Sequence, residues 1–231
     1  MNILLTNDDG IDAPGLEALR LIAQAFGSPL IVAPLVERSG CSHSATTDRA
    51  IRVTELAPDR IAVDGTPADC VRIALHRHPG QIGWVFAGIN NGGNLGTDVY
   101  LSGTVAAVRE AAMRGIPGIA ISNHRYRILA DADWRRATRL AQPIIAGIME
   151  RTWRQGTFWN INLPCLEDDV VQPDVVYCPL DSSPLPLSFH EENGTYRYNA
   201  KYRERARIPG SDVDVCFAGR IAVTQLRVVG V

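Results

Sequence analysis

Short apolar runs alternate with longer segments of helical periodicity through the first two thirds of the chain. Four runs are mostly apolar and too short for helices, which is typical of strands buried on both faces; they are the opening run that ends at Asn7, and residues 29–34, 83–88 and 116–122. Apolar residues recur at helical spacing in four other segments, which are residues 14–26, 67–76, 105–113 and 132–154. Because a strand, a helix and a second strand open the chain, the pattern predicts βαβ units, a parallel sheet and an α/β fold.

Capping residues and prolines indicate where several helices begin or break. Asp12 is expected to cap the first helix, with Pro14 in its first turn. Thr66 is expected to cap the second helix, with Pro67 as its first residue. Pro143 lies inside the last helical segment, which it should kink or divide.

The character of the chain changes after residue 165. Prolines and short alternating segments replace the strand and helix rhythm, and residues 173–206 suggest hairpins or an extended arm. Residues 220–228 have the pattern of a last strand. A chain of 231 residues suits one domain, in which we expect residues 1–165 to form the core and residues 166–231 to complete it as arm and hairpins. Such arms commonly cover a site or exchange with a neighbouring subunit, and the sequence leaves both open.

Composition and charge narrow the class of protein. The formal net charge is −2 and the sequence pI is about 6.2, with no run of like charges. This balance predicts no binding to a nucleic-acid polymer or to an anionic membrane surface. The chain shows no signal-type apolar region, and no apolar stretch reaches the roughly 18 to 20 residues that a membrane span requires. We therefore expect a cytoplasmic protein without a membrane partner.

The cysteines and histidines give no metal-binding or disulfide pattern. The five cysteines are an odd number without a CxxC pair, so free thiols that pack as small apolar side chains are the simpler interpretation. Cys41 is an exception to follow, because it lies in the polar loop 36–49, which should border the candidate site. His43 lies in the same loop and is open to two interpretations, a surface side chain or an acid group near the site.

Oxygen-bearing side chains follow three of the predicted core strands. Asp8 and Asp9 come directly after the first strand, Ser39 lies in the loop after the second, and Asn90 and Asn94 follow the third. The carboxyl ends of parallel strands share one edge of the sheet, where ligands bind. Carboxylate, hydroxyl and amide oxygens suit a hard cation such as Mg²⁺, with Mn²⁺ as a substitute. The alternative for the two acids is a strand-end turn in which one aspartate caps the next helix.

A loop rich in glycine and asparagine, residues 89–98, precedes Ser102-Gly103-Thr104 and a predicted helix. Backbone N–H groups at the start of that helix, together with two hydroxyls, would form a cradle for a phosphate group. An ordinary Ser or Thr N-cap is the alternative. The stretch lacks the lysine and the spacing of a P-loop, and the chain has neither GxSxG nor a GxGxxG after its first strand. These absences argue against a P-loop triphosphatase, a Ser-His-Asp hydrolase and a dehydrogenase.

Four ordered motifs lie in the first half of the chain. They are Asn7-Asp8-Asp9-Gly10, Glu37-Arg38-Ser39-Gly40, Gly65-Thr66-Pro67-Ala68-Asp69, and the stretch from Gly88-Ile89-Asn90 through Asn94-Leu95-Gly96 to Ser102-Gly103-Thr104-Val105. Any one of them is a weak signal, but their order and spacing together are specific. The chain thereby resembles the SurE family, the survival protein E acid phosphatases that act as 5′/3′-nucleotidases.

This resemblance implies a Rossmann-like α/β fold, with a mostly parallel sheet flanked by helices, a C-terminal β-hairpin arm and a homodimer or homotetramer. It also implies hydrolysis of nucleoside 5′- and 3′-monophosphates with one divalent cation per subunit, Mg²⁺ or Mn²⁺. The metal ligands carried over by motif are Asp8, Asp9, Ser39 and Asn90. The residues near the phosphate are Asn94, Ser102, Gly103 and Thr104. Departures from the usual family pattern at Ala87, Gly93 and Leu101 touch none of these positions.

Two chemical routes and one rival function stay open. In the first route, one of Asp8 and Asp9 orients or deprotonates an attacking water, because the neighbouring charge and the metal separate the proton affinities of the two carboxylates. In the second route, Asp8 attacks the phosphorus and forms an aspartyl-phosphate. The rival is a nucleotide-binding module that senses phosphate without turnover. Release of phosphate from nucleoside monophosphates distinguishes an enzyme from such a sensor.

Overall fold

The protein, as a computed structural model, is described over residues 1–166 and 172–228. Within these residues one nine-stranded sheet has the order β3-β4-β2-β1-β5-β6-β7-β11-β8. Its strands are β1 (Asn2–Thr6), β2 (Ser28–Pro34), β3 (Val53–Ala57), β4 (Arg60–Val63), β5 (Ile82–Asn90), β6 (Gly118–Asn123), β7 (Thr157–Leu163), β8 (Val175–Tyr177) and β11 (Ile221–Arg227). The strands from β4 to β7 are parallel to their neighbours, whereas β3 and β11 pair antiparallel with β4 and β7. The predicted α/β fold with a mostly parallel sheet is confirmed.

The strand β1 lies near the centre of this sheet, and strands that follow it in sequence lie on both of its sides. It pairs in parallel with β2, which follows it in sequence, and with β5 on its other side. The strand order therefore reverses between β1 and β5. Such a topological switch point, at the carboxyl edge of the strands, is where open α/β sheets bind their ligands.

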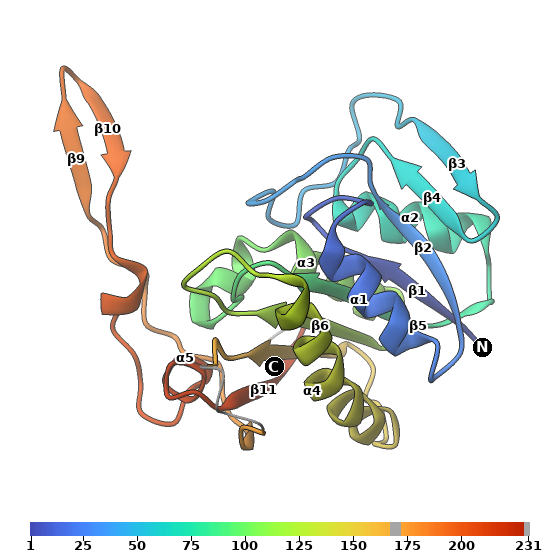
Figure 1. Ribbon diagram of the computed structural model, residues 1–231. Coiled ribbons are helices and arrows are strands. Elements are labelled where there is room, and N and C mark those ends of the chain that lie inside the picture. Colours follow the sequence, from blue (N-terminus) through green and yellow to red (C-terminus); the bar gives the residue numbers. More distant parts are fainter. Residues whose placement is uncertain (167–171, 229–231) are drawn as a thin grey trace.

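Helices cover both faces of the sheet (Figure 1). One face carries α1 (Pro14–Ala23) and α4 (Asp131–Met149), and the other carries α2 (Pro67–Arg77) and α3 (Gly103–Met113). Leu5 and Phe86 belong to the apolar core on the first face, while Leu4 and Val85 belong to the core on the second. This two-sided burial explains why the central strands are continuously apolar. None of the helices in the described part of the chain is long and apolar enough to cross a membrane.

Of the two predicted N-cap residues, one is confirmed and the other is wrong. Thr66 caps α2, as predicted, and forms a capping box with Asp69. The prediction that Asp12 caps α1 is wrong, because Ala13 is the N-cap residue and has no side-chain hydrogen bond. The Asp12 carboxylate instead accepts a hydrogen bond of 2.6 Å from Arg60. An ion pair with a residue distant in sequence has replaced the local cap.

Two segments are more continuous than their patterns predicted. The helix α4 runs through Pro143 without being divided. The strand β5 extends two residues past its predicted end at Gly88, so Asn90 is the last residue of a strand and not a loop residue. Asn90 pairs there with Ser122 of β6, after a register shift that begins at Ala87.

The C-terminal part of the chain both joins the sheet and extends away from it. The strand β11 pairs with β7, and β8 pairs in parallel with β11, so β8 lies in the sheet although hairpins or an arm were expected from residue 173 onward. The expected hairpin consists of β9 (Phe189–Glu192) and β10 (Thr195–Tyr198), all of whose residues are exposed. It projects from the body of the molecule (Figure 1). The short helix α5 (Asp212–Phe217) was not predicted.

The predicted division of the chain at residue 165 is next to residues 167–171, which lie outside the described residues. The predicted C-terminal segment also includes residues 229–231, which lie outside them as well. The division into core and arm therefore stays a prediction.

Buried polar groups hold the base of the arm against the turn η1 (Gly96–Tyr100). Asp212 accepts hydrogen bonds of 2.8 Å from the N–H groups of Gly96 and Asp181. Arg205, whose side chain is fully buried, pairs with Asp98 at 2.8 Å. These contacts anchor the arm to the segment that precedes α3.

Candidate active site

Asp8 and Asp9 follow β1 at the switch point of the sheet. Gly10 closes this turn with a φ angle of 102°, which glycine adopts without steric cost. The loop after β5 meets it there, because the Asn91 N–H donates to Asp9 Oδ2 at 3.1 Å. The structure thus brings together the loops after β1 and β5, as the sequence predicted.

Asp8 faces the N-terminus of α3. Its Oδ2 accepts a hydrogen bond of 3.2 Å from the Gly103 N–H, and its Oδ1 accepts one from the Thr104 hydroxyl. Burial raises the pKa of Asp8, while the bonds from Thr104 and Gly103 act in the opposite direction. The positive end of α3 therefore stabilises a carboxylate that would otherwise be costly to bury.

Asp9 is more accessible than Asp8 and accepts one hydrogen bond, from Asn91. Burial raises the pKa of Asp9 to about 6, and the charges of Asp8 and Glu37 add to this rise. The Asn91 bond and the charge of Arg125 lower it. Three acidic side chains thus act on one small region, and a divalent cation would favour the ionised forms of both aspartates.

The loop after β2 brings Ser39 to the same edge of the sheet. The N–H of Arg38 donates to the backbone carbonyl of Asp8 at 2.7 Å, which ties this loop to the end of β1. Ser39 itself is exposed, and its hydroxyl donates to Glu37 at 2.7 Å. Ser39 therefore directly follows the residue whose backbone contacts Asp8.

Cys41 lies beside Asp8, where the sequence placed its loop. A Cβ atom added to Gly103 would come within 2.8 Å of Cys41 Sγ and 2.9 Å of Asp8 Cβ, so these three residues are tightly packed. Burial raises the pKa of the Cys41 thiol to about 11, and the charge of Asp8 contributes to the rise. Burial thus favours the protonated thiol over the nucleophilic thiolate at neutral pH.

Asn90 and Asn94 make internal hydrogen bonds in this structure. The Asn90 amide donates to the carbonyl of Gly92 at 2.8 Å, which leaves its Oδ1 outside that bond. Asn94 is buried, and its amide donates to Ser122 Oγ at 2.8 Å. The backbone of Asn94 is held as well, since its N–H donates to Asn162 Oδ1 at 2.8 Å. Asn94 thus fixes the shape of the loop in which it lies.

Ser102 is the N-cap residue of α3. Its Oγ accepts a hydrogen bond of 3.0 Å from the N–H of Val105. This is the ordinary capping role that the sequence left open beside the phosphate role. Because a hydroxyl can accept and donate at once, the Ser102 proton is still free for a ligand oxygen.

A second cluster ties the loop after β2 to the middle of α3. Glu110, buried in α3, pairs with His43 at 3.1 Å and with Arg114 at 3.0 Å, and Arg72 lies 3.9 Å away. The bond from His43 lowers the pKa of Glu110, while burial opposes that shift and Arg114 reinforces it. His43 is therefore neither a free surface side chain nor a partner of Asp8, because its ring faces Glu110.

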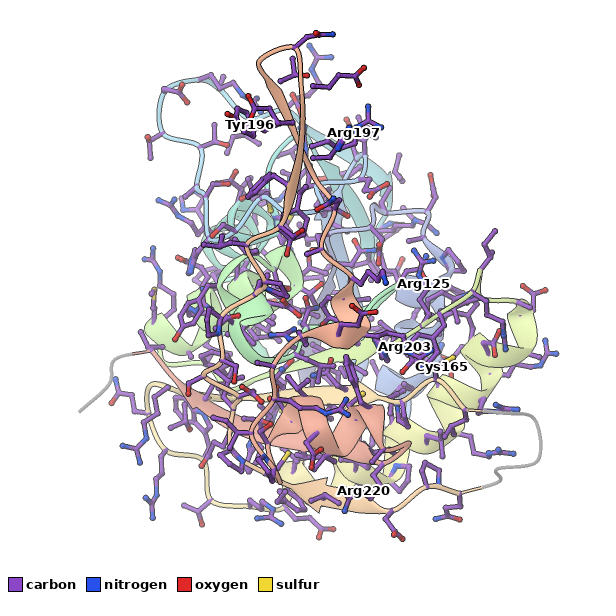
Figure 2. All side chains as sticks on the ribbon, turned by 90° about the vertical axis from the view of Figure 1, so that its left-hand side faces the viewer. Arg125, Cys165, Tyr196, Arg197, Arg203 and Arg220 are labelled. Atoms are coloured by element: carbon purple, nitrogen blue, oxygen red, sulfur yellow. The ribbon has the colours of Figure 1, made fainter. Side chains whose placement is uncertain are left out.

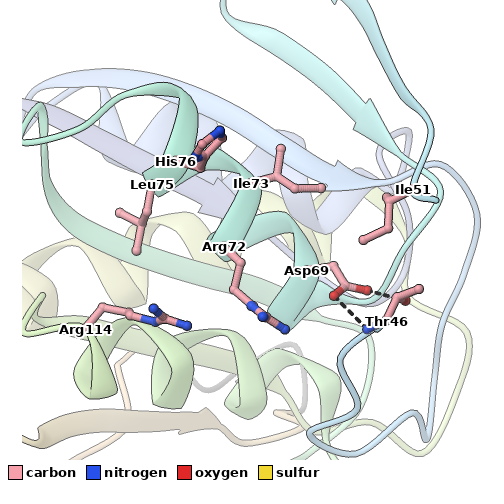
Figure 3. Close-up of a pocket in the computed structure, with 8 residues that line it drawn as sticks. All are labelled: Thr46, Ile51, Asp69, Arg72, Ile73, Leu75, His76 and Arg114. Atoms are coloured by element: carbon pink, nitrogen blue, oxygen red, sulfur yellow. Dashed lines mark hydrogen bonds between the residues drawn. The ribbon is translucent and has the colours of Figure 1, made fainter. Parts of the chain in front are cut away.

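A pocket of about 530 Å³ opens beside this cluster (Figure 3). It is lined by Thr46, Ile51, Asp69, Arg72, Ile73, Leu75, His76 and Arg114. None of the site residues predicted from the sequence lines it. Asp69 in this pocket is already used by the backbone N–H and hydroxyl of Thr46. The pocket is thus separate from the candidate active site.

Sequence reasoning missed two sets of residues. Asn160 and Asn162 both donate to the Asn94 carbonyl, at 2.8 and 3.0 Å. They lie two residues apart in the mostly apolar β7, and this was a usable signal, because buried amides on one face of a strand need partners. Arg125, which acts on Asp9, lies in a segment without a motif, so no pattern in the sequence pointed to it.

The donor set at the switch point fits a hard divalent cation. Each aspartate has more lone pairs than its hydrogen bonds use. Within residues 1–166 and 172–228, no group of three or more His, Cys, Asp or Glu side chains could hold a metal ion. A site here would therefore combine two carboxylates with neutral oxygens such as Asn90 Oδ1 and Ser39 Oγ. Such a mixed oxygen set suits Mg²⁺ or Mn²⁺ better than zinc.

The fold and the site together define a class of protein, a doubly wound α/β protein with an acid pair at its switch point and a helix N-terminus directed at that pair. A comparison with family models then identifies the family. The model described as "Survival protein SurE" matches residues 3–182, and the chain belongs to the SurE family. The resemblance found in the sequence motifs is confirmed.

Relatives of known name match the whole chain. The "Putative 5'-nucleotidase alr3139" of Nostoc sp. (strain PCC 7120) is 47% identical over 230 residues, which cover 99% of this chain and 100% of the relative. A Synechocystis protein of the same name is 49% identical with the same coverage. The crystal structure of the SurE protein from Aquifex aeolicus superposes with a TM-score of 0.86 and 28% identity, covering 100% of this chain and 95% of that one.

Proposed function

We propose that this protein is a divalent-metal-dependent phosphomonoesterase that hydrolyses nucleoside 5′- and 3′-monophosphates to nucleoside and phosphate. Membership of the SurE family supports a nucleotidase, because relatives that match along their full length bear the name "Putative 5'-nucleotidase" and others that match over much of their length bear the name "5'-nucleotidase SurE". The observation in the structure that carries the proposal is the acid pair at the switch point, a buried Asp8 beside a partly buried Asp9, with the N-terminus of α3 directed at Asp8.

The proposed metal ligands are Asp8, Asp9, Ser39 and Asn90, which hold one Mg²⁺ or Mn²⁺ per subunit. When bound, this cation supplies positive charge to the phosphoryl oxygens and acidity to the attacking water. The protein holds Asp8 in one orientation through the Gly103 N–H and the Thr104 hydroxyl. A ligand oriented in this way needs little rearrangement when the cation binds.

Asp8 and Asp9 differ in the roles their surroundings support. Both oxygens of Asp8 accept hydrogen bonds. Asp9 accepts its hydrogen bond from Asn91 through Oδ2, and this bond does not use its Oδ1. We therefore assign orientation to Asp8 and proton uptake from the attacking water to Asp9. The rival route, attack by Asp8 on phosphorus, would leave a phosphorylated Asp8 after the ester oxygen departs. Rapid quenching of a single turnover with labelled phosphate would trap that adduct, and finding it would overturn the assignment.

The proposed phosphate contacts are Asn94, Ser102, Gly103 and Thr104. The Ser102 hydroxyl, at the N-cap of α3, has a proton available for a phosphoryl oxygen. The N–H groups of Gly103, Val105 and Ala106 already donate to Asp8 and Ser102, so α3 contributes the positive end of its dipole to the phosphate. Asn94 contributes by holding its loop, because its amide and backbone are bonded to Ser122 and Asn162.

The proposal includes a homodimer or homotetramer in the cytoplasm. Its structural support is the β9–β10 hairpin, which projects from the body with exposed aromatic residues; Tyr196 is 66% exposed and Phe189 is 52% exposed. Exposed aromatic side chains of this kind gain stability by packing on a second copy of the chain.

A substrate panel tests the proposed function. Nucleoside 5′- and 3′-monophosphates are incubated with the protein and with Mg²⁺, Mn²⁺ or a chelator, and released phosphate is measured. We expect release from both classes with either metal, and none with the chelator. Tight binding of the same nucleotides without release of phosphate would support the rival sensor function.

A further inference from the structure

The segment after β6 reaches the same edge of the sheet as the two aspartates. The strands β6 and β5 are parallel neighbours, so residues that follow Asn123 lie near those that follow Asn90. The His124 N–H donates to the carbonyl of Leu163 at 2.8 Å, which continues the pairing with β7. The start of this segment is therefore fixed by the sheet.

His124 and Tyr126 hold the segment against the base of the arm. His124 is 3% exposed and stacks on Phe217 of α5, with ring centroids 5.1 Å apart. Tyr126 packs edge-on against His124 at 4.7 Å, and the guanidinium of Arg203 lies 3.6 Å from the centroid of the Tyr126 ring. Aromatic stacking and a cation–π contact thus hold the residues on either side of Arg125.

Arg125 itself is linked to Asp9 through one residue of the loop after β5. Its Nε donates to the carbonyl of Asn91 at 3.1 Å, and the N–H of the same Asn91 donates to Asp9 Oδ2 at 3.1 Å. A single residue of the β5 loop therefore lies between the guanidinium and the Asp9 carboxylate. In agreement with this geometry, the charge of Arg125 lowers the pKa of Asp9. Figure 2 shows Arg125 on the face of the molecule from which the arm rises, near Arg203.

The terminal nitrogens of Arg125 are available to a ligand. Its hydrogen bond to Asn91 uses Nε, and no ion pair within the described part of the chain involves Arg125. The nearby Arg38 differs, because its guanidinium is paired with Asp64 at 2.9 Å. Arg125 is exposed, so a ligand in solution can reach its two Nη groups.

Charge complementarity points to the ligand. Asp8, Asp9 and Glu37 surround the candidate site with negative charge, which repels a phosphate dianion even when one divalent cation is bound. We propose that Arg125 is a phosphate-positioning residue, whose Nη groups bind the phosphoryl oxygens of a phosphate monoester at this site. A planar guanidinium fixed at Nε presents its remaining donors in a fork that matches two such oxygens. This inference rests on the proposed function and assigns a further residue to it.

Calorimetric titration with inorganic phosphate tests this role without turnover. Phosphate is titrated into the Mg²⁺- or Mn²⁺-loaded wild type, R125A, R125K and R52A. Arg52 is an exposed arginine before the edge strand β3, so R52A removes the same charge three strands away from β1. The loss of charge-assisted hydrogen bonds should weaken phosphate binding about ten- to a hundredfold in R125A. R125K should lose less, and R52A should match the wild type.

Two further readouts separate positioning from structural damage. Metal affinity should not weaken in R125A, because the change removes a cation from an acidic site. The KM values for adenosine 5′-monophosphate and for p-nitrophenyl phosphate should rise by the same factor, with kcat changed less. Equal phosphate affinity in the wild type and R125A, or a KM rise confined to the nucleotide, would overturn the proposal. If the wild type releases no phosphate from any monoester, the proposed function fails, while the titration still decides the role of Arg125.

Discussion

Asp8 and His124 show how differently two buried polar side chains are accommodated. Asp8 accepts hydrogen bonds from Gly103 and Thr104, so its charge has local compensation. His124 is packed among aromatic rings, and its Nε2 has no hydrogen-bond partner in the structure described. Burial lowers the pKa of His124 to about 4, and the charge of Arg203 adds to this effect. The first residue is suited to carry charge and the second to remain neutral.

The stability of the protein should therefore depend on His124 in mildly acidic solution. A folded histidine with a pKa of about 4 binds protons less readily than an unfolded one, whose pKa is about 6.5. Its contribution to stability is complete above pH 6.5 and is lost as the pH falls toward 4. We predict that the free energy of unfolding falls between pH 7.5 and pH 5 by about 1–2 kcal/mol more in the wild type than in His124→Phe.

Thermal melts of the two proteins at both pH values measure this difference. The Phe side chain keeps an aromatic ring beside Phe217 and cannot ionise, so it serves as the matched reference. Parallel pH profiles for the wild type and the variant would contradict the assignment of His124 as a buried neutral group.

The start of α3 is the element on which the candidate site depends most. Asp8 Oδ2 is bonded to the Gly103 N–H, and no side chain fits at position 103 because Cys41 and Asp8 would lie under 3.0 Å from its Cβ. We predict that Gly103→Ala displaces Asp8 or the helix start, and that kcat/KM for a nucleoside monophosphate falls at least tenfold. The measurement is steady-state phosphate release with metal present.

Gly147 supplies the control for this substitution. It lies inside α4, and a Cβ added there would meet no atom within 4 Å. Gly147→Ala should keep full activity and gain about 0.5–1 kcal/mol of stability, because alanine is the better helix former. Equal activity in Gly103→Ala and the wild type would show that the α3 contact is not needed.

The elements whose signals are local could be predicted, and those that depend on distant partners could not. The Thr66 cap follows from neighbouring residues alone and was predicted. Asp12 has the same local signature, but its carboxylate pairs with Arg60 of β4. The helix α5 is six residues long, too short to show periodicity, and it is held by bonds such as that between Asp212 and the Gly96 N–H.

For the candidate site, the positions of the residues could be predicted from the sequence, but the contacts of their side chains could not. Asp8, Asp9 and Asn90 could be placed at one edge of the sheet because parallel strands share that edge. The direction of the side chains could not, since the bonds of Asn94 to Ser122 and of Thr104 to Asp8 depend on how segments distant in sequence pack together. Arg125 was missed because its position depends on aromatic and cation–π contacts between the segment after β6 and the arm base.

At the scale of the whole molecule, the arm is anchored at its base and exposed at its tip. Arg205 and Asp212 hold the base, whereas every residue of β9 and β10 is exposed. The two ends of the hairpin are close together, because the Asn199 N–H donates to the Ser188 carbonyl at 3.0 Å. The tip can therefore be removed without disturbing the sheet.

Replacing residues 189–198 by a short Gly-Ser linker should reduce the oligomeric state and leave the fold intact. The exposed aromatic hairpin is the surface we propose for contact between copies, and the body keeps all of its sheet pairing. Light scattering after size-exclusion chromatography measures the mass, and circular dichroism checks the fold. A variant with the wild-type mass and a native spectrum would exclude the hairpin as the oligomer contact.

The proposed function depends on Asp8 as a metal ligand, and one experiment tests this role most directly. Phosphate release from a nucleoside 5′-monophosphate is measured for the wild type and Asp8→Asn with a chelator and again after excess Mg²⁺ or Mn²⁺ is restored. We predict that metal restores release in the wild type, and that the nearly isosteric variant folds but stays at least a hundredfold slower. Wild-type rates in Asp8→Asn, or release that a chelator leaves unchanged, would contradict the account.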